Sequence, residues 1–170
     1  CSVKTAETRN WCCENSYRLM IYREGRLEDK EQILVLGRAM HNESAYAYLN
    51  WSDDKASKLL SSYVNNNNCC CFVSEKDGAL TGMIAGRVSE YFFGNDLILN
   101  EIVWFVDHEN RGTITSVRLL KMFIDFGKKF NVAEVCIGVS TQVLLDRTDK
   151  LLTRFNFENV GGTYKFMMKG

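Results

Sequence analysis

The run from Asp96 to Lys129 most constrains the fold of this chain. Residues 96–106 (DLILNEIVWFV) are apolar and β-prone, and residues 113–129 repeat apolar side chains with helical spacing. The start of such a helix leaves about four backbone N–H groups without partners and carries the positive end of the helix dipole. The junction therefore predicts an anion site. An ordinary strand–turn–helix connection is the alternative.

Two residues at this junction favour a phosphate-bearing ligand. Gly112 allows the backbone to approach a bulky guest closely. Arg111 supplies a fixed positive charge that suits phosphate. We therefore expect a phosphate-bearing cofactor that is held mainly by backbone groups.

Composition excludes several classes of protein. The 170 residues contain 21 Lys plus Arg and 21 Asp plus Glu, so the net charge is zero. This balance argues against a surface dedicated to nucleic acid. No apolar run approaches the roughly 18–20 residues of a membrane span, so we predict no membrane partner. With two histidines, and cysteines that lack zinc-site spacing, we also predict no metal.

Cysteine usage favours a reducing compartment. Seven cysteines are present, and the odd number fits poorly with a closed disulfide framework. Cys69, Cys70 and Cys71 are adjacent on a predicted strand, so their side chains should alternate between its two faces. We interpret them as reduced, largely buried thiols of a cytoplasmic protein.

The order of elements predicts one α/β (α+β) domain. We expect residues 1–15 to be a flexible leader and residues 16–170 to form the domain. Asp77-Gly78 is a hairpin signal, and Ser52 is a candidate N-cap. The order β-α-α-β-β-β-α-β-α-β predicts a mixed sheet of about six to seven strands with about four helices. Strands are expected near 17–22, 71–73, 79–88, 96–106, 134–139 and 160–168, and helices over 28–41, 53–64, 113–129 and 148–155.

This order, with an Arg-Gly turn after the fourth strand, resembles the GNAT family of acetyl-CoA-dependent N-acetyltransferases over residues 17–168. The family run V-x-P-x-x-R-G-x-G-x-G-x-x-L is matched at Val106, Arg111, Gly112 and Leu119. Ile114 replaces the first motif glycine, and Ser116 stands for the final small residue. Downstream, LLTRFNF (151–157) is similar to the family's L-Y-x-x-x-G-F. The segments GRAMHNES and GMIAG look like small GNAT proteins of bacteria and their phages.

The resemblance implies acetyl-CoA as co-substrate and places its binding residues. The pyrophosphate cradle would be the run Arg111, Gly112, Thr113, Ile114, Thr115 and Ser116, with the Ile114 side chain entering the core. A bulge within residues 103–106 would let the pantetheine arm pair with the backbone of Trp104, Phe105 and Val106. Ser140 would contact the pantetheine or cap a helix. In relatives the first helix and its loop, including Glu43 and Tyr46, form the acceptor wall.

Two residues are candidates for catalysis. Glu101 is a carboxylate within an apolar strand, so burial would raise its pKa and suit it to act as general base. A structural role is the equal alternative. Relatives often use a tyrosine as general acid at the place of Leu152, and leucine cannot donate a proton. Tyr164 is the candidate substitute.

The resemblance therefore implies an N-acetyltransferase that acts on a primary amine of a small molecule or a protein. The alternative is a catalytically inactive binding or structural protein with the GNAT fold, such as a phage component. Fold alone does not give the substrate. The oligomeric state stays open, and a homodimer is one alternative.

Overall fold

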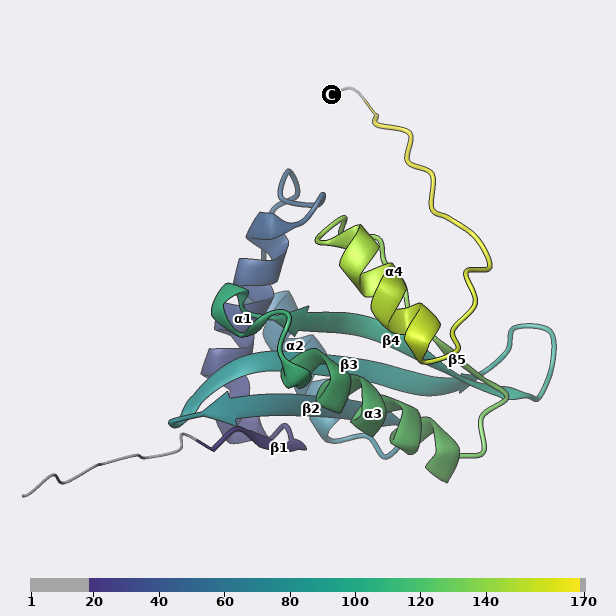
Figure 1. The fold of residues 1–170 in the computed structure, drawn as a ribbon, viewed down its shortest axis with the longest axis horizontal. Helices are drawn as coiled ribbons and strands as arrows, with labels where there is room; N and C mark the ends of the chain where they lie inside the picture. Colours follow the sequence, from purple (N-terminus) through teal and green to yellow (C-terminus); the bar gives the residue numbers. More distant parts are fainter. Residues whose placement is uncertain (1–18, 169–170) are drawn as a thin grey trace, which may run out of the picture.

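A five-stranded mixed sheet organises the chain. The computed structural model describes residues 19–168, so the predicted leader and the start of the predicted first strand lie outside the described residues. The strand order is β1-β2-β3-β4-β5; the first four strands pair antiparallel, and β5 pairs parallel to β4 (Figure 1). The strands are β1 (Ile21–Glu24), β2 (Cys69–Lys76), β3 (Ala79–Glu90), β4 (Leu97–Val106) and β5 (Glu134–Cys136).

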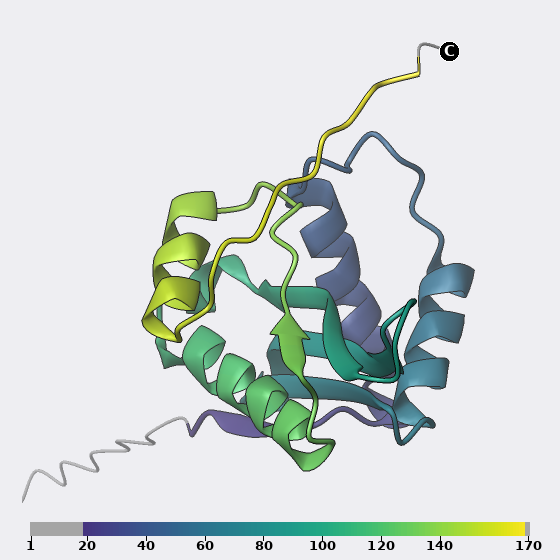
Figure 2. The same cartoon turned by 90° about the vertical axis from the view of Figure 1, so that its right-hand side faces the viewer.

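Helices cover both faces of the sheet (Figure 2). The helices are α1 (Lys30–Glu43), α2 (Asp53–Val64), α3 (Ile114–Lys129) and α4 (Leu145–Arg154), with short 3-10 turns η1 (Leu27–Asp29) and η2 (His108–Asn110). One core cluster joins α1 and α2 to the sheet, and a second joins α3 to it. No helix in residues 19–168 is long and apolar enough to cross a membrane.

The three adjacent cysteines alternate between the two faces of their strand, as predicted. Cys69, Cys70 and Cys71 are all buried in β2. Cys71 belongs to the cluster under α1 and α2, whereas Cys70 belongs to the cluster under α3. Desolvation raises the pKa of both thiols to about 12, so they remain protonated core residues at neutral pH.

Local signals set most element boundaries. Ser52 caps α2, and its hydroxyl accepts the N–H of Lys55 at 3.4 Å. Asp77 and Gly78 both have positive φ, 53° and 80°, as a two-residue hairpin turn requires. These two predictions are confirmed.

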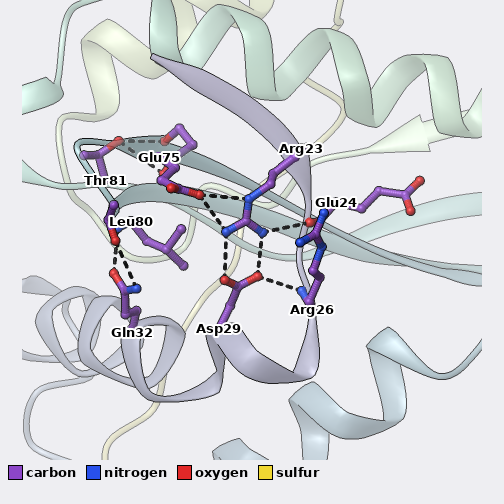
Figure 3. Close-up of polar contacts among 10 residues, drawn as sticks. Arg23, Glu24, Arg26, Asp29, Gln32, Glu75, Leu80 and Thr81 are labelled. Atoms are coloured by element: carbon purple, nitrogen blue, oxygen red, sulfur yellow. Dashed lines mark hydrogen bonds and ion pairs between the residues drawn. The ribbon is translucent and has the colours of Figure 1, made fainter. Parts of the chain in front are cut away.

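A charged network joins β1 to the start of α1 (Figure 3). Arg23 donates two hydrogen bonds to the carboxylate of Asp29, at 2.6 and 2.8 Å, and two to Glu75 on β2, at 2.9 and 2.7 Å. The Asp29 carboxylate also accepts the N–H of Arg26 at 2.8 Å. Asp29 is buried, and these partners lower its pKa. The network therefore fixes the direction in which the chain enters α1.

The prediction of a last strand over residues 160–168 is wrong. Residues 157–168 follow α4 as an extended trace without strand pairing, so the described sheet has five strands rather than six to seven (Figure 1). Val160 and Phe166 are 94% and 88% exposed. β-Propensity describes how a residue fits a paired, half-buried surface. It does not supply the neighbouring strand.

Candidate functional site

The site begins where β4 and β5 separate. Their parallel pairing runs from Ile98 opposite Glu134 to Asn100 opposite Cys136 and stops there. Residues 101–106 pair with β3 on one side only. An open strand edge presents backbone N–H and C=O groups to an extended guest. Beyond Asn100 and Cys136 the two strands leave a gap in the pairing, and the edge of β4 there presents backbone groups with which an extended ligand could pair.

A β-bulge in β4 marks the same point. Ala85 pairs with Val103 while Gly86 pairs with Glu101, so Ile102 is the extra residue. The bulge was predicted within residues 103–106 and lies one residue earlier. A Cβ at Gly86 would stand 2.5 Å from the carbonyl oxygen of Asn100, which only glycine permits. Gly86 therefore lets β3 approach β4 where β4 bends away from β5.

Glu101 lies at the mouth of this gap. Its Oε2 accepts the backbone N–H of Gly138, the second residue after β5, at 3.2 Å. Protein surrounds most of the side chain, although part of it reaches solvent. Desolvation raises the pKa of Glu101 to about 7, and the bond from Gly138 acts in the opposite direction. At neutral pH this carboxylate can both accept and release a proton.

The start of α3 forms an exposed backbone turn. Gly112 has φ +74°, and a Cβ there would meet no atom within 4 Å. Thr113 caps the helix by accepting the N–H of Thr115 at 3.2 Å, and the Thr115 side chain is fully buried. Ser116 is half-buried. The Ile114 side chain is 57% exposed, so the expectation that it enters the core is wrong. It lies at the helix tip, where the chain is turning outward.

Arg111 points away from this turn. Its Nε donates to the carbonyl oxygen of Val106 at 2.7 Å, and its guanidinium lies 4.9 Å from the centroid of the Phe105 ring. Its Nη2 forms a 2.6 Å ion pair with Oε2 of Glu43, at the end of α1. The guanidinium therefore joins α1 to the end of β4, and the helix turn depends on backbone groups for any anion.

The apolar side chains at the end of β4 belong to the core. Phe105 packs in the cluster under α1 and α2, whereas Val106 and the partly buried Trp104 belong to the cluster under α3. These side chains are packed against protein. Any contact that these residues make with a ligand in the gap would therefore use their backbone.

The loop after α1 closes one side of the gap. The N–H of Ala45 donates to the carbonyl oxygen of Thr141 at 2.9 Å. Ser140 lies close enough to Tyr46 to lower the pKa of the Tyr46 hydroxyl. The N-cap of α4 is Leu144, so Ser140 does not cap this helix. Ser140 thus links the segment after β5 to the loop after α1.

The structure does not bring Tyr164 into the gap. Its side chain is 98% exposed on the C-terminal segment, because the expected closing strand is absent from the described residues. Leu152 is buried in α4. The neighbouring Lys165 instead contacts Tyr46, with its Nζ 3.6 Å from the ring centroid. Sequence spacing gave no signal of this contact. Within residues 19–168 no cluster of His, Cys, Asp and Glu could hold a metal ion.

Comparisons identify the fold. No protein-family model and no curated protein matches the sequence. A predicted acetyltransferase from Clostridium acetobutylicum, solved with acetyl-CoA, is similar with TM-score 0.68 and 14% identity over 88% of this chain and 96% of that one. Glucosamine-6-phosphate N-acetyltransferase from Arabidopsis thaliana has TM-score 0.68 and 13% identity over 89% and 99%. A transcriptional regulator from Bacillus halodurans has TM-score 0.72 and 12% identity over 88% and 100%.

The similarity to these solved structures extends over most of the chain. The chain has the fold of the GNAT acetyltransferases. The regulator among the similar structures shows that the name attached to this fold varies, so activity has to be argued from the residues of the site.

Proposed function

We propose that the chain is an N-acetyltransferase that uses acetyl-CoA to acetylate a primary amine. The observation that carries this proposal is the position of Glu101, a carboxylate with a pKa of about 7 at the point where β4 and β5 part, as a general base would require. A base of this pKa is matched to work at neutral pH. The comparisons support the proposal because several similar structures are acetyltransferases, one of them with acetyl-CoA.

The residues present fit acetyl-CoA. The exposed turn of Gly112 and Thr113 offers helix N-terminal N–H groups to a pyrophosphate, with open space above Gly112. The free edge of residues 103–106 offers a backbone ladder to a pantetheine arm. Bound acetyl-CoA would supply a thioester as acyl donor. The β4 backbone N–H groups on the open side would then polarise the carbonyl, and Glu101 would accept the amine proton.

The first test is turnover. Purified protein with acetyl-CoA and a panel of primary amines, covering an aminoglycoside, an amino sugar, a polyamine and a lysine peptide, should release CoA thiol with at least one of them. Glu101→Gln should bind acetyl-CoA equally well and turn over slowly. If the panel releases no thiol above the buffer rate, the enzymatic proposal is contradicted.

A binding protein without turnover is the second candidate. The observation that favours it is the lack of an evident general acid in the described chain: Leu152 is a buried leucine, and Tyr164 is 98% exposed. In that case acetyl-CoA would bind and stabilise the fold while none of the amines promotes thiol release. A thiolate is a fair leaving group, so we rank turnover first.

A further inference from the structure

The C-terminal segment places a primary amine against the loop that follows α1. Lys165 places its Nζ 3.6 Å from the centroid of the Tyr46 ring, where a cation meets the negative face of the π system. The segment begins at α4, where the N–H of Phe157 donates to the carbonyl oxygen of Leu152 at 3.1 Å. Figure 2 shows it continuing as an extended trace without strand pairing. Strand pairing therefore does not fix the position of Lys165 relative to the sheet.

A series of contacts connects this amine to the region of the proposed base. Lys165 lies on Tyr46, and the neighbouring Ala45 donates its N–H to the carbonyl oxygen of Thr141, beside Ser140, at 2.9 Å. Ser140 follows Gly138, whose N–H binds the Glu101 carboxylate at 3.2 Å. Gly138 and Ser140 are two residues apart, so their Cα atoms are separated by at most about 7 Å. The loop that holds Lys165 and the carboxylate of Glu101 therefore both contact the short segment after β5.

On this basis, and resting on the proposed acetyltransferase function, we propose that Lys165 is an intramolecular acetyl acceptor, a lysine that the chain modifies on its own C-terminal segment. The lysine side chain would slide from the Tyr46 ring toward Glu101. In this proposal the Tyr46 ring holds the ammonium of Lys165 by a cation–π contact before the ammonium loses its proton. The flexible stem of lysine, with its rotatable bonds, suits this movement.

The reaction balances without a further reagent. Glu101 takes one proton from the ammonium of Lys165, and the neutral Nζ forms an amide bond with the acetyl carbon. The thioester C–S bond breaks and the sulfur leaves as thiolate; the nitrogen gives up its second proton as the amide forms, and that proton converts the thiolate to CoA thiol. The net products are acetyl-lysine, CoA thiol and one proton released to solvent.

Acetylation would also change the contact between Lys165 and Tyr46. The product has no positive charge, so the cation–π attraction to Tyr46 is lost. The modified segment would leave Tyr46 and Ser140 exposed to an external amine. A self-acetylated chain is therefore expected to acetylate free amines faster than the unmodified chain.

The test follows isotope-labelled acetyl groups on each lysine by mass spectrometry. The full chain is incubated with acetyl-CoA at neutral pH, and Lys129 serves as the reference because it is exposed at the opposite end of α3 from Gly112. We expect Lys165 to be labelled about 100-fold faster than Lys129, as positioning of a reactant predicts. The rate constant should not change when the protein is diluted tenfold, because donor site and acceptor share one chain.

Matched variants distinguish the role of Lys165 as acceptor from the role of Tyr46 in holding it. Lys165→Arg keeps the cation but removes the acceptor and should abolish the fast phase, whereas Lys129→Arg should leave it intact. Tyr46→Leu should slow labelling of Lys165 and leave that of Lys129 unchanged. Lys165 labelled no faster than Lys129, or a rate that rises with protein concentration, would overturn the inference.

The amine panel distinguishes the two proposals. If free amines are acetylated while Lys165 is not, the self-acetylation inference fails and the proposed function stands. If neither Lys165 nor any free amine is acetylated, both proposals fail, and a rise in melting temperature with acetyl-CoA would then favour the binding protein without turnover.

Discussion

The carboxylate of Glu101 accepts the backbone N–H of Gly138 at 3.2 Å, across the point where β4 and β5 part. This bond joins the two strands just beyond their last paired residues. Burial there raises the pKa of Glu101 to about 7, although the Gly138 bond lowers it. One side chain thus combines a structural contact with the proton affinity of a general base.

The first prediction concerns the pH profile of turnover. The base must be deprotonated to act, so the wild-type rate should rise with pH through about 7, the pKa of Glu101, and then level off. Glu101→Gln keeps the size of the side chain and should lower the rate about 100- to 10,000-fold, the usual contribution of a general base. Initial rates between pH 5.5 and 9 measure this. A variant that retains the wild-type profile would remove Glu101 from the mechanism.

The second prediction concerns the bulge. A methyl group at Gly86 would stand 2.5 Å from the carbonyl oxygen of Asn100 and from the Phe123 ring, so either β3 or β4 must shift. Gly86→Ala should lower the free energy of unfolding by about 3 kcal/mol, as overpacking does. Gly94→Ala is the control, because a Cβ there meets nothing within 4 Å. Urea denaturation should separate the two; equal stabilities would contradict the described bulge geometry.

The third prediction concerns Arg111. Arg111→Ala removes the hydrogen bond to Val106 and the contact with Phe105, and should cost about 2 kcal/mol of unfolding free energy. Glu43→Gln removes only the ion pair. Its side chain is 38% exposed, so the loss should be at most about 1 kcal/mol. A double-mutant cycle by chemical denaturation measures the pair, and a coupling energy of zero would contradict the ion pair.

The fourth prediction concerns the acid stability of the Arg23 network. Arg23 lowers the pKa of Asp29, so this carboxylate contributes stability above its unfolded pKa of about 3.9 and loses it as pH falls through its lower folded pKa. Asp29→Asn should cost about 2 kcal/mol at pH 7 and progressively less below pH 4.

Asp54→Asn is the matched control for this network. Asp54 pairs with Lys58 at an exposed position, so its loss should change stability by less than about 0.5 kcal/mol at any pH. Thermal melts from pH 2.5 to 7 measure both variants. A cost for Asp29→Asn that stays constant with pH would show that Asp29 acts through its shape and not its charge.

Local patterns in the sequence predicted most of the framework. The hairpin at Asp77-Gly78, the cap at Ser52 and the amphipathic α3 depend on short-range rules, and the structure confirms them. Glu101 was selected as a carboxylate within an apolar strand, and the structure shows the burial that this pattern implies. Its role as a base stays a prediction.

The remaining features depend on contacts between distant residues. The ion pair of Arg111 with Glu43 and the contact of Lys165 with Tyr46 join different parts of the chain, and no local spacing encodes them. The C-terminal strand was expected from β-prone residues, but a strand also needs a partner. Similarly, the apolar character of Ile114 suggested burial, whereas its place at the helix tip leaves it 57% exposed.

The effect of acetyl-CoA on thermal unfolding tests directly whether the folded chain binds this co-substrate. Only the folded chain presents the Gly112 turn and the open β4 edge, so acetyl-CoA at about 100 times its Kd should add about 2.7 kcal/mol and raise Tm by roughly 5–10 °C. Adenosine, which lacks the pyrophosphate, should give little shift. Gly112→Val should abolish the shift, because its side chain would fill the open space at the helix start and strain a backbone at φ +74°. No shift of the wild-type protein with millimolar acetyl-CoA or CoA would contradict the central claim.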